Sequence, residues 1–207
     1  SQRLQGITGN RSLSEFATWA DGARNSPEWS HTSTWHYINI DKARNTEAPQ
    51  DIVQAIDYLE RELAAAPTKE QKLVCIKFII HFVGDLHQPL HSGNSLDRGG
   101  NSVNVNFQGR SMNLHALWDG AMIQTLNLNA EQYSLRLMRM GWSKGLLNQR
   151  FDPQDVLAEN AELLRFVYSY TGNSVDQTYV LKAIEQTDKR IWAGGLRLAS
   201  FLNQMLE

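Results

Sequence analysis

The chain has 207 residues, 42% of them hydrophobic and 20% charged, which is enough for one domain with a substantial core. A net charge of −2 argues against a protein whose affinity for nucleic acid comes from a broad basic surface, so any such contact is expected to be local. Cys75 is the single cysteine, which excludes a disulfide framework, and the most apolar run, residues 73–83, is too short to span a bilayer.

Helical patterns dominate the sequence, and several begin with residues that cap helix N-termini. Ser12 and Glu15 have the spacing of a capping box, as do Thr68 and Gln71. Asp152 precedes a proline at a first helical position, another helix-start signal. We expect helices over residues 12–20, 51–63, 68–87, 113–126, 130–148, 152–170 and 176–206.

The convincing β signal is the strict polar and apolar alternation of residues 102–107, followed by Gln108-Gly109 and a possible return strand. It predicts a hairpin inserted between two helices. Residues 27–48 are irregular and rich in Asn, Ser, Thr and Trp, which favours a functional loop. We therefore predict a mainly α, bundle-like fold with one small β-hairpin, formed by a single domain over residues 1–207.

Residues 130–150 carry four basic side chains against one acidic side chain, Glu131. This pattern favours a solvated helix face over a phosphate-binding patch. Four aromatic residues at helical spacing are expected in the core: Trp142, Phe166, Trp192 and Phe201.

Two short helical motifs place five potential metal ligands within 39 residues. The first is His81-x-x-x-Asp85 followed by His91, and the second is His115-x-x-x-Asp119. Residues four apart lie on one face of a helix, so each pair can direct two donors at one ion or at two neighbouring ions. A Gln-Pro step ends the first helix and is expected to turn His91 back toward the same place.

A single His/Asp pair with this spacing is more often a hydrogen-bonded or exposed pair than a metal site. Here the pair occurs twice, and four of the six histidines fall between residues 81 and 115. Imidazole and carboxylate are what zinc accepts where thiolates are scarce, and Cys75 is the lone candidate thiolate. The cluster as a whole therefore favours a zinc centre.

Several further motifs occur in a fixed order around this cluster. They are Ala17-Thr18-Trp19-Ala20-Asp21, Trp35-His36-Tyr37-Ile38-Asn39, the His81 to His91 segment, Gly99-Gly100-Asn101 and Asn113-Leu114-His115-Ala116-Leu117-Trp118-Asp119. In these motifs the sequence resembles the zinc-dependent single-strand nucleases and 3′-nucleotidases of the mung-bean type. That family is related to the bacterial zinc-dependent phospholipases C, and the resemblance implies a mainly α-helical domain with three zinc ions in one cleft.

The resemblance also implies which residues bind the ions. One zinc would be held by Asp21, His36, His81 and Asp85. Another would be held by His91, His115 and Asp119, and Asp85 would also bridge to a third ion.

In the family, the other ligands of the third zinc come from an N-terminal Trp and a nearby His. This sequence begins with Ser1-Gln2-Arg3, and its first histidine is His31. We therefore expect a chain that lacks the N-terminal ligand-bearing helix and fully ligates two ions. If the third ion does bind, His31 or His87 would be the first candidates for its missing ligand.

The resemblance assigns substrate contacts near these ligands. Arg24, one turn after Asp21, would bind an oxyanion of the scissile phosphate, and Asp85 and Arg24 are the expected catalytic residues. Tyr37 would stack on a base, and Asn39 would read the base edge where relatives carry Asp. The alternatives are that Arg24 is a surface arginine and that Tyr37 only packs beside the metal.

Together these features predict a monomeric zinc-dependent phosphodiesterase and phosphomonoesterase. Its expected substrates are single-stranded DNA and RNA, cleaved internally to leave 5′-phosphates, and 3′-nucleotides. The family implies a periplasmic or secreted protein without a membrane anchor. The alternatives are a phospholipase C and a metal-binding relative with impaired catalysis; a di-iron bundle is disfavoured because one Glu-x-x-His motif is present, at Glu28 to His31, in a loop.

Overall fold

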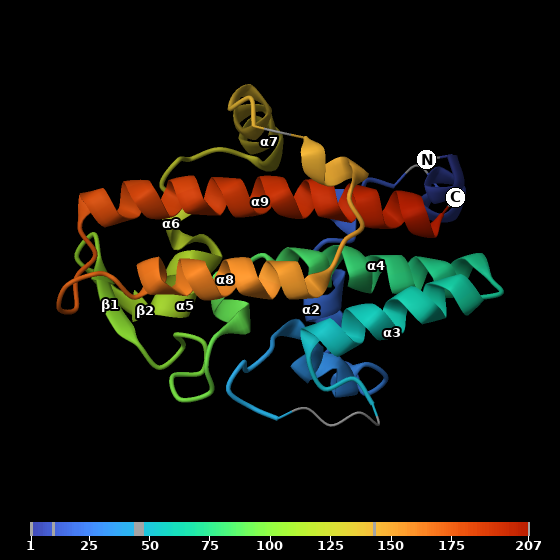
Figure 1. Cartoon of the computed structure of the whole chain (residues 1–207), viewed down its shortest axis with the longest axis horizontal. Helices are drawn as coiled ribbons and strands as arrows, with labels where there is room; N and C mark the ends of the chain where they lie inside the picture. Colours follow the sequence, from blue (N-terminus) through green and yellow to red (C-terminus); the bar gives the residue numbers. More distant parts are fainter. Residues whose placement is uncertain (1, 10, 44–47, 143, 207) are drawn as a thin grey trace.

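The computed structural model describes residues 2–9, 11–43, 48–142 and 144–206, and within these ranges it is a helical protein with one β-hairpin (Figure 1). The long helices α8 (Pro153–Val167) and α9 (Gln177–Met205) follow the long axis of the molecule. Helices α3 (Ile52–Ala65) and α4 (Lys69–Leu86) form an antiparallel pair at the end that also holds both chain termini. This arrangement confirms the predicted mainly α fold.

Two hydrophobic cores lie on either side of the centre of the molecule. The first core is formed mainly by α3, α4 and the C-terminal part of α9. The second contains the hairpin, the helical segment that follows it and the first turns of α9. Leu86 belongs to the first core and Leu90 to the second, so the short segment between them passes from one core to the other.

The capped helix starts predicted from the sequence are present. Thr68 and Gln71 form both hydrogen bonds of a capping box at the start of α4. Asp51 accepts hydrogen bonds from two backbone N–H groups at the start of α3, and Asp152 caps α8 with Pro153 in its first turn. These local interactions satisfy backbone donors that a helix leaves free at its start.

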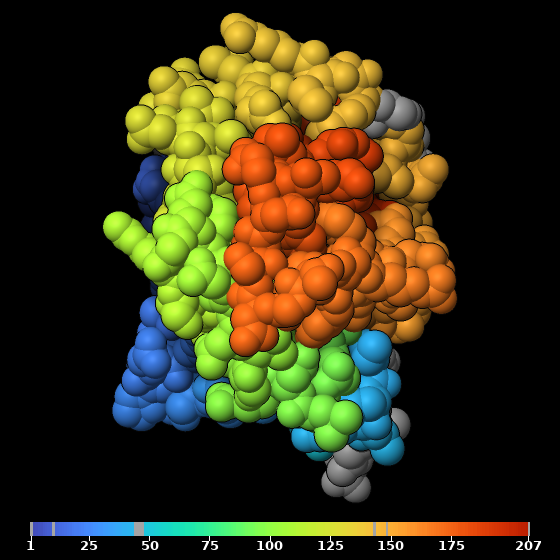
Figure 2. All heavy atoms as spheres, turned by 90° about the vertical axis from the view of Figure 1, so that its left-hand side faces the viewer, coloured from blue at the N-terminus to red at the C-terminus, as the bar shows by residue number. Residues whose placement is uncertain are grey.

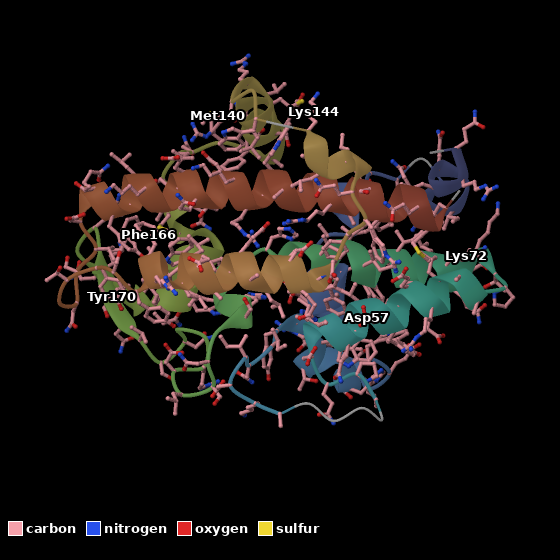
Figure 3. All side chains as sticks on the ribbon, viewed as in Figure 1. Asp57, Lys72, Met140, Lys144, Phe166 and Tyr170 are labelled. Carbon is pink, nitrogen blue, oxygen red and sulfur yellow. The ribbon has the colours of Figure 1, made fainter. Side chains whose placement is uncertain are left out.

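The predicted hairpin is also present, as β1 (Asn104–Phe107) and β2 (Arg110–Asn113). Gln108 and Gly109 both have positive φ, at 53° and 78°, which is the backbone of a tight two-residue turn. The side chains of β1 alternate between exposed and buried. Phe166 at the end of α8 and Tyr170 just after it pack against the second core, and Figure 3 labels both at the end of the molecule that holds the hairpin.

The helix predicted over residues 12–20 is interrupted. The capping box at Ser12 opens a single 3-10 turn, η1 (Leu13–Glu15), and α2 (Trp19–Ala23) follows after a break. Phe16 is buried in the first core, and Trp19 packs edge-on against Phe78 with 5.0 Å between ring centroids. Tertiary packing of these two rings overrides the local helical pattern. A further helix, α1 (Gln2–Thr8), precedes this segment and was not predicted.

The single helix predicted over residues 130–148 is two elements, α7 (Ala130–Arg139) and η5 (Gly145–Asn148). Gly141 ends the first with a φ of +67°, a conformation that favours glycine at helix ends. Residue 143 lies outside the described part of the chain. Helix α7 stands above α9 in Figure 1, and Met140 and Lys144 lie on the same side in Figure 3.

The helix predicted over residues 113–126 is continuous but not uniform. It consists of α5 (Leu114–Ala116), the π-helical turn η4 (Leu117–Ala121) and α6 (Met122–Gln124). Such π turns occur preferentially at functional sites. Asp119, one of the predicted ligands, lies in this turn.

Candidate metal centre

The last turns of α4 supply the first pair of donors. His81 and Asp85 are one helical turn apart, and His81 Nε2 lies 3.0 Å from Asp85 Oδ2. The 3-10 turn η2 (Ser30–His36) brings His36 to the same point, with His36 Nδ1 3.0 Å from Asp85 Oδ2. Asp21 from α2 completes this side, with its Oδ1 at 3.8 Å from His36 Nδ1 and 3.7 Å from His81 Nε2. We call Asp21, His36 and His81 donor group A.

The chain reverses after α4, as the Gln-Pro step predicted. Gln88 caps the 3-10 turn η3 (Pro89–Ser92) by accepting a hydrogen bond from the backbone N–H of Leu90. His91 in this turn lies close to the pair on η4, with its Nε2 3.6 Å from Asp119 Oδ1. His115 Nε2 lies 3.4 Å from Asp119 Oδ2. His91, His115 and Asp119 form donor group B.

Within the described residues, these two groups are the ones whose donor atoms converge closely enough to hold a metal ion. They contain six of the seven predicted ligands, and the seventh, Asp85, lies between them. Its Oδ2 contacts both histidines of group A, and its Oδ1 lies 3.6 Å from His91 Nδ1. The sequence motifs therefore predicted which side chains the fold brings together.

Backbone carbonyls hold three of the four histidines in one orientation. His81 Nδ1–H donates to the carbonyl oxygen of Ala17 at 2.5 Å. His91 Nδ1–H donates to the carbonyl oxygen of His36 at 2.9 Å, and His115 Nδ1–H donates to that of Gly99 at 2.7 Å. This arrangement directs the Nε2 atom of each ring at the centre of its group. Hydrogen bonds of this kind fix the tautomer of a metal-binding histidine and raise its basicity.

His36 is turned the other way and directs Nδ1 at the centre. His36 Nδ1 and His81 Nε2 lie 3.0 Å apart, and both contact the same carboxylate oxygen of Asp85. In the neutral form of His81, its Nε2 carries a lone pair there, because its Nδ1 donates to a carbonyl. A shared cation would satisfy these converging groups, and two imidazoles with carboxylates match the ligands that zinc accepts. The residues present therefore fit zinc.

The pKa values of the carboxyl groups reflect the same crowding. Burial acts to raise the pKa of Asp85, but hydrogen bonds with His36 and His81 hold that pKa well below its usual range. Burial likewise opposes ionisation of Asp119, whereas the hydrogen bond with His91 and the charge of His115 lower its pKa. Both side chains are therefore kept as carboxylates, the form in which they bind metal ions.

The turn after η3 supports group B through two glycines. Gly99 has a φ of +59°, and a Cβ at this position would lie 2.4 Å from Leu90 O. Gly99 O accepts from His115, and Gly100 O accepts from the backbone N–H of the same histidine. Close packing of this backbone against Leu90 therefore sets the position of one donor. This is the structural reason for the Gly99-Gly100 motif in the sequence.

A largely buried polar network, which sequence reasoning missed, contacts the chain reversal between α4 and η3. Glu159 of α8 pairs with Arg190 and Arg197 of α9. Arg197 donates to His87 Nε2 at 3.1 Å, and Arg190 donates to the carbonyl oxygen of His87 at 3.2 Å. Burial and the two nearby guanidinium groups lower the pKa of His87 to about 3, so this ring is neutral. His87 is therefore occupied by a structural role.

Asn160 joins this network to the segment that carries His91. Its Nδ2 donates to Leu86 O at 2.8 Å and to Ser92 Oγ at 2.7 Å, and its Oδ1 accepts from Arg190 at 2.7 Å. The network thus fixes both ends of the chain reversal between α4 and η3. Arg197 in the last helix is a weak sequence signal for such a network. Its partners Glu159 and His87 lie about 40 and 110 positions away in the chain, so no local pattern connects them.

Asp21 and His36 of donor group A and all three members of donor group B line one cleft of about 1090 Å³. The three predicted substrate contacts, Arg24, Tyr37 and Asn39, line the same cleft. Arg24 Nη2 lies 2.9 Å from Asp21 Oδ1, and the Tyr37 side chain is 41% exposed. His31 lies outside this cleft, so it does not join the donors.

Comparisons with known proteins identify the family of the chain. The S1/P1 Nuclease family description matches residues 1–207. The chain belongs to the S1/P1 nuclease family. It is 29% identical to Endonuclease 5 of Arabidopsis thaliana, over 93% of this chain and 77% of that protein. It is 28% identical to Nuclease P1 of Penicillium citrinum, over 97% of this chain and 88% of that protein.

Membership makes the chain a hydrolytic nuclease of a zinc-dependent family. This confirms the predicted family and enzyme class. Among the described helices, none has the length and apolar character needed to cross a membrane.

Proposed function

We propose that this chain cleaves single-stranded DNA and RNA internally to leave 5′-phosphates, and that it also removes phosphate from 3′-nucleotides. The observation that carries the proposal is one cleft that joins donor groups A and B to an arginine and an exposed tyrosine. A phosphate ester, a base and metal ions can therefore meet in one place. The nuclease family favours this reading over the phospholipase C alternative.

Donor group A with Asp85 would hold one zinc ion, and donor group B would hold another. When bound, zinc makes water more acidic and offsets the negative charge of a phosphate group. Asp85 contacts histidines of both groups, so its role is to fix the position of donor group A relative to donor group B. The periplasmic or secreted location, the monomeric state and the number of ions are predictions that accompany this proposal.

Arg24 would bind a non-bridging oxygen of the scissile phosphate, because its guanidinium reaches the cleft beside Asp21. Tyr37 would stack on an unpaired base next to that phosphate. A duplex hides the faces of its bases, so stacking on Tyr37 explains a preference for single strands. Asn39 would contact the edge of the stacked base and can both donate and accept hydrogen bonds.

The test compares cleavage of single-stranded and duplex DNA of one sequence by the zinc-loaded chain. We expect rapid cleavage of the single strand, slow cleavage of the duplex, and loss of activity and of thermal stability with excess EDTA. Zinc should restore both properties, whereas magnesium should not, since imidazole-rich sites disfavour it. Zinc-loaded chain that cleaves neither DNA would contradict the proposal and favour the metal-binding relative without catalysis.

A further inference from the structure

Four side chains that line the cleft are basic: Arg24, Lys42, Arg98 and Arg190. Two of them have carboxylate partners, since Arg24 pairs with Asp21 and the buried Arg190 pairs with Glu159. Lys42 and Arg98 are exposed and form no ion pair with any described residue. Lys42 and Arg98 therefore face the cleft with no ion pair to another residue in the described part of the chain.

The backbone of Arg98 has an unusual conformation. Its φ is 57°, and the next two residues, Gly99 and Gly100, also have positive φ. The described non-glycine residues with positive φ are Arg98, Gln108 and Asn127, and of these side-chain types asparagine tolerates this region best. Glycine would form the same turn without strain, so the stereochemistry of the turn gives no reason for an arginine. Strain of this kind is a pointer to function when the side chain lies at a site.

This turn is fixed to donor group B. Gly99 O accepts the hydrogen bond of the His115 ring, and Asp97 Oδ1 accepts from the backbone N–H of Gly100 at 3.1 Å. Tyr168 donates to Asp97 Oδ2 at 2.6 Å and so connects the turn to the end of α8. Arg98 is therefore one residue from the carbonyl that orients a metal ligand, on a backbone held from both sides.

The segment that carries Lys42 is bound to the same region. Ser95 donates to Asp41 with its backbone N–H at 2.8 Å and with its hydroxyl at 2.6 Å. The backbone N–H of Ile40 donates to Gly93 O at 3.1 Å. In Figure 2 the light-blue segment around residues 38–43 lies against the green segment around residues 93–98. Lys42 and Arg98 thus belong to neighbouring segments joined by hydrogen bonds.

We propose that Lys42 and Arg98 form a phosphate rim that binds the phosphates flanking the scissile one in a single-stranded nucleic acid. The inference rests on the proposed function, because the scissile phosphate is taken to lie at the donor groups. A net charge of −2 for the whole chain means that strand binding depends on such local charges. The rim would favour oligonucleotides over the smallest substrates, which have no flanking phosphate.

The test uses the zinc-loaded full chain with two substrates, a dinucleoside monophosphate and a single-stranded decanucleotide. The first contains the scissile phosphate alone, and the second contains flanking phosphates. For Arg98→Gly and for Lys42→Ala we expect kcat/KM on the decanucleotide to fall about fivefold at about 0.1 M salt. The slope of log(kcat/KM) against log salt concentration should become shallower by about 0.7 for each phosphate contact that is lost. The dinucleoside monophosphate should be cleaved as by the wild type, and Lys42→Arg should retain activity on both.

Two matched variants isolate the effect. Gln108→Gly makes the same backbone change at another positive-φ position, in the hairpin turn. Arg110→Ala removes an exposed charge from β2, outside the cleft. Both should leave both substrates unaffected. Arg98→Gly should not lower the melting temperature, because glycine adopts this φ without strain.

An equal loss on both substrates, or an unchanged decanucleotide rate, would overturn the inference. Fluorescence anisotropy measures the affinity for a decanucleotide with phosphorothioate links. This affinity tests the contribution of the rim to binding without depending on turnover. Chain that binds this strand through Lys42 and Arg98 but cleaves neither substrate would refute the proposed function and support the rim. If the chain cleaves single strands and both variants bind the decanucleotide as tightly as the wild type, the proposed function is supported and the rim is refuted.

Discussion

At the scale of single residues, the fold decides which nitrogen of each histidine is presented. Local spacing predicted that His81, His91 and His115 gather, and the family resemblance added His36. Neither predicted that His36 presents Nδ1 while the other three present Nε2. That choice depends on carbonyls up to 64 residues away in the chain, which no local pattern encodes.

Tyr37 and Asp85 have separable roles, so their alanine variants should differ. Tyr37 is 41% exposed, and Tyr37→Ala removes its ring. We expect KM for single strands to rise by the factor that corresponds to a lost stacking free energy of about 1–3 kcal/mol, with zinc content unchanged. Asp85→Ala removes the carboxylate that contacts His36 and His81, so both zinc content and activity should fall. Metal analysis and steady-state kinetics measure the two effects.

Tyr37→Phe is the control, because it keeps a ring that can stack. We expect it to retain the wild-type KM. Equal loss of zinc from the Tyr37→Ala and Asp85→Ala chains would show that Tyr37 packs against the metal site as a structural residue.

At the scale of elements, helices with strong caps and regular apolar spacing were predictable. Helices α3, α4, α8 and α9 begin within a residue of where Asp51, Thr68, Asp152 and Asp176 indicate. The segments that differ from prediction are those where tertiary contacts or glycine act against a local helical pattern. The helix predicted over residues 113–126 forms but contains a π turn, and this turn carries the predicted ligand Asp119.

The Gly99-Gly100 turn gives a prediction at this scale, with Gly109 as a matched control. Both Gly99 and Gly109 have positive φ, but a Cβ at Gly99 would clash with Leu90 O whereas a Cβ at Gly109 would meet nothing within 4 Å. Gly99→Ala should therefore displace the carbonyl that orients His115 and lower zinc affinity at donor group B by about 10–100-fold.

Gly109→Ala should reduce stability by about 1–2 kcal/mol through backbone strain and leave zinc affinity intact. Zinc titration and urea denaturation of both chains separate the two effects. If both variants keep full zinc affinity, the turn does not position His115.

At the scale of the whole molecule, the site occupies the passage between the two cores. The chain reversal between Leu86 and Leu90 is fixed by α8 and α9 through Asn160, Arg190 and His87. Sequence reasoning identified the ligands on this reversal because metal-binding spacing is a strong pattern. It missed the network, since Glu159 and the arginines read as ordinary charges on helix faces until the helices are packed together.

The last prediction concerns Glu159, which pairs with two arginines whose side chains are 8–10% exposed. Burial opposes its ionisation, but these arginines lower the pKa of Glu159 to about 2 from an ordinary value of 4.5. A carboxyl whose pKa is lower in the folded chain stabilises the fold above its unfolded pKa and loses that contribution as the pH falls. The wild type should therefore lose stability from this group as the pH falls from 4.5 toward 2.

Glu159→Gln should lower the free energy of unfolding at pH 7 by about 2 kcal/mol, less than for a fully buried pair because the Glu159 side chain is 44% exposed. The free energy of unfolding of the variant should also lack the decrease between pH 4.5 and 2 that this carboxyl contributes in the wild type. Glu162→Gln, on the same helix but with a 76% exposed side chain, should match the wild type. Urea denaturation with EDTA at neutral and acid pH measures these differences, since protonation of the metal ligands contributes equally to all three chains. A Glu159→Gln chain as stable as Glu162→Gln at pH 7 would show that the network does not hold α8 and α9 against the metal centre.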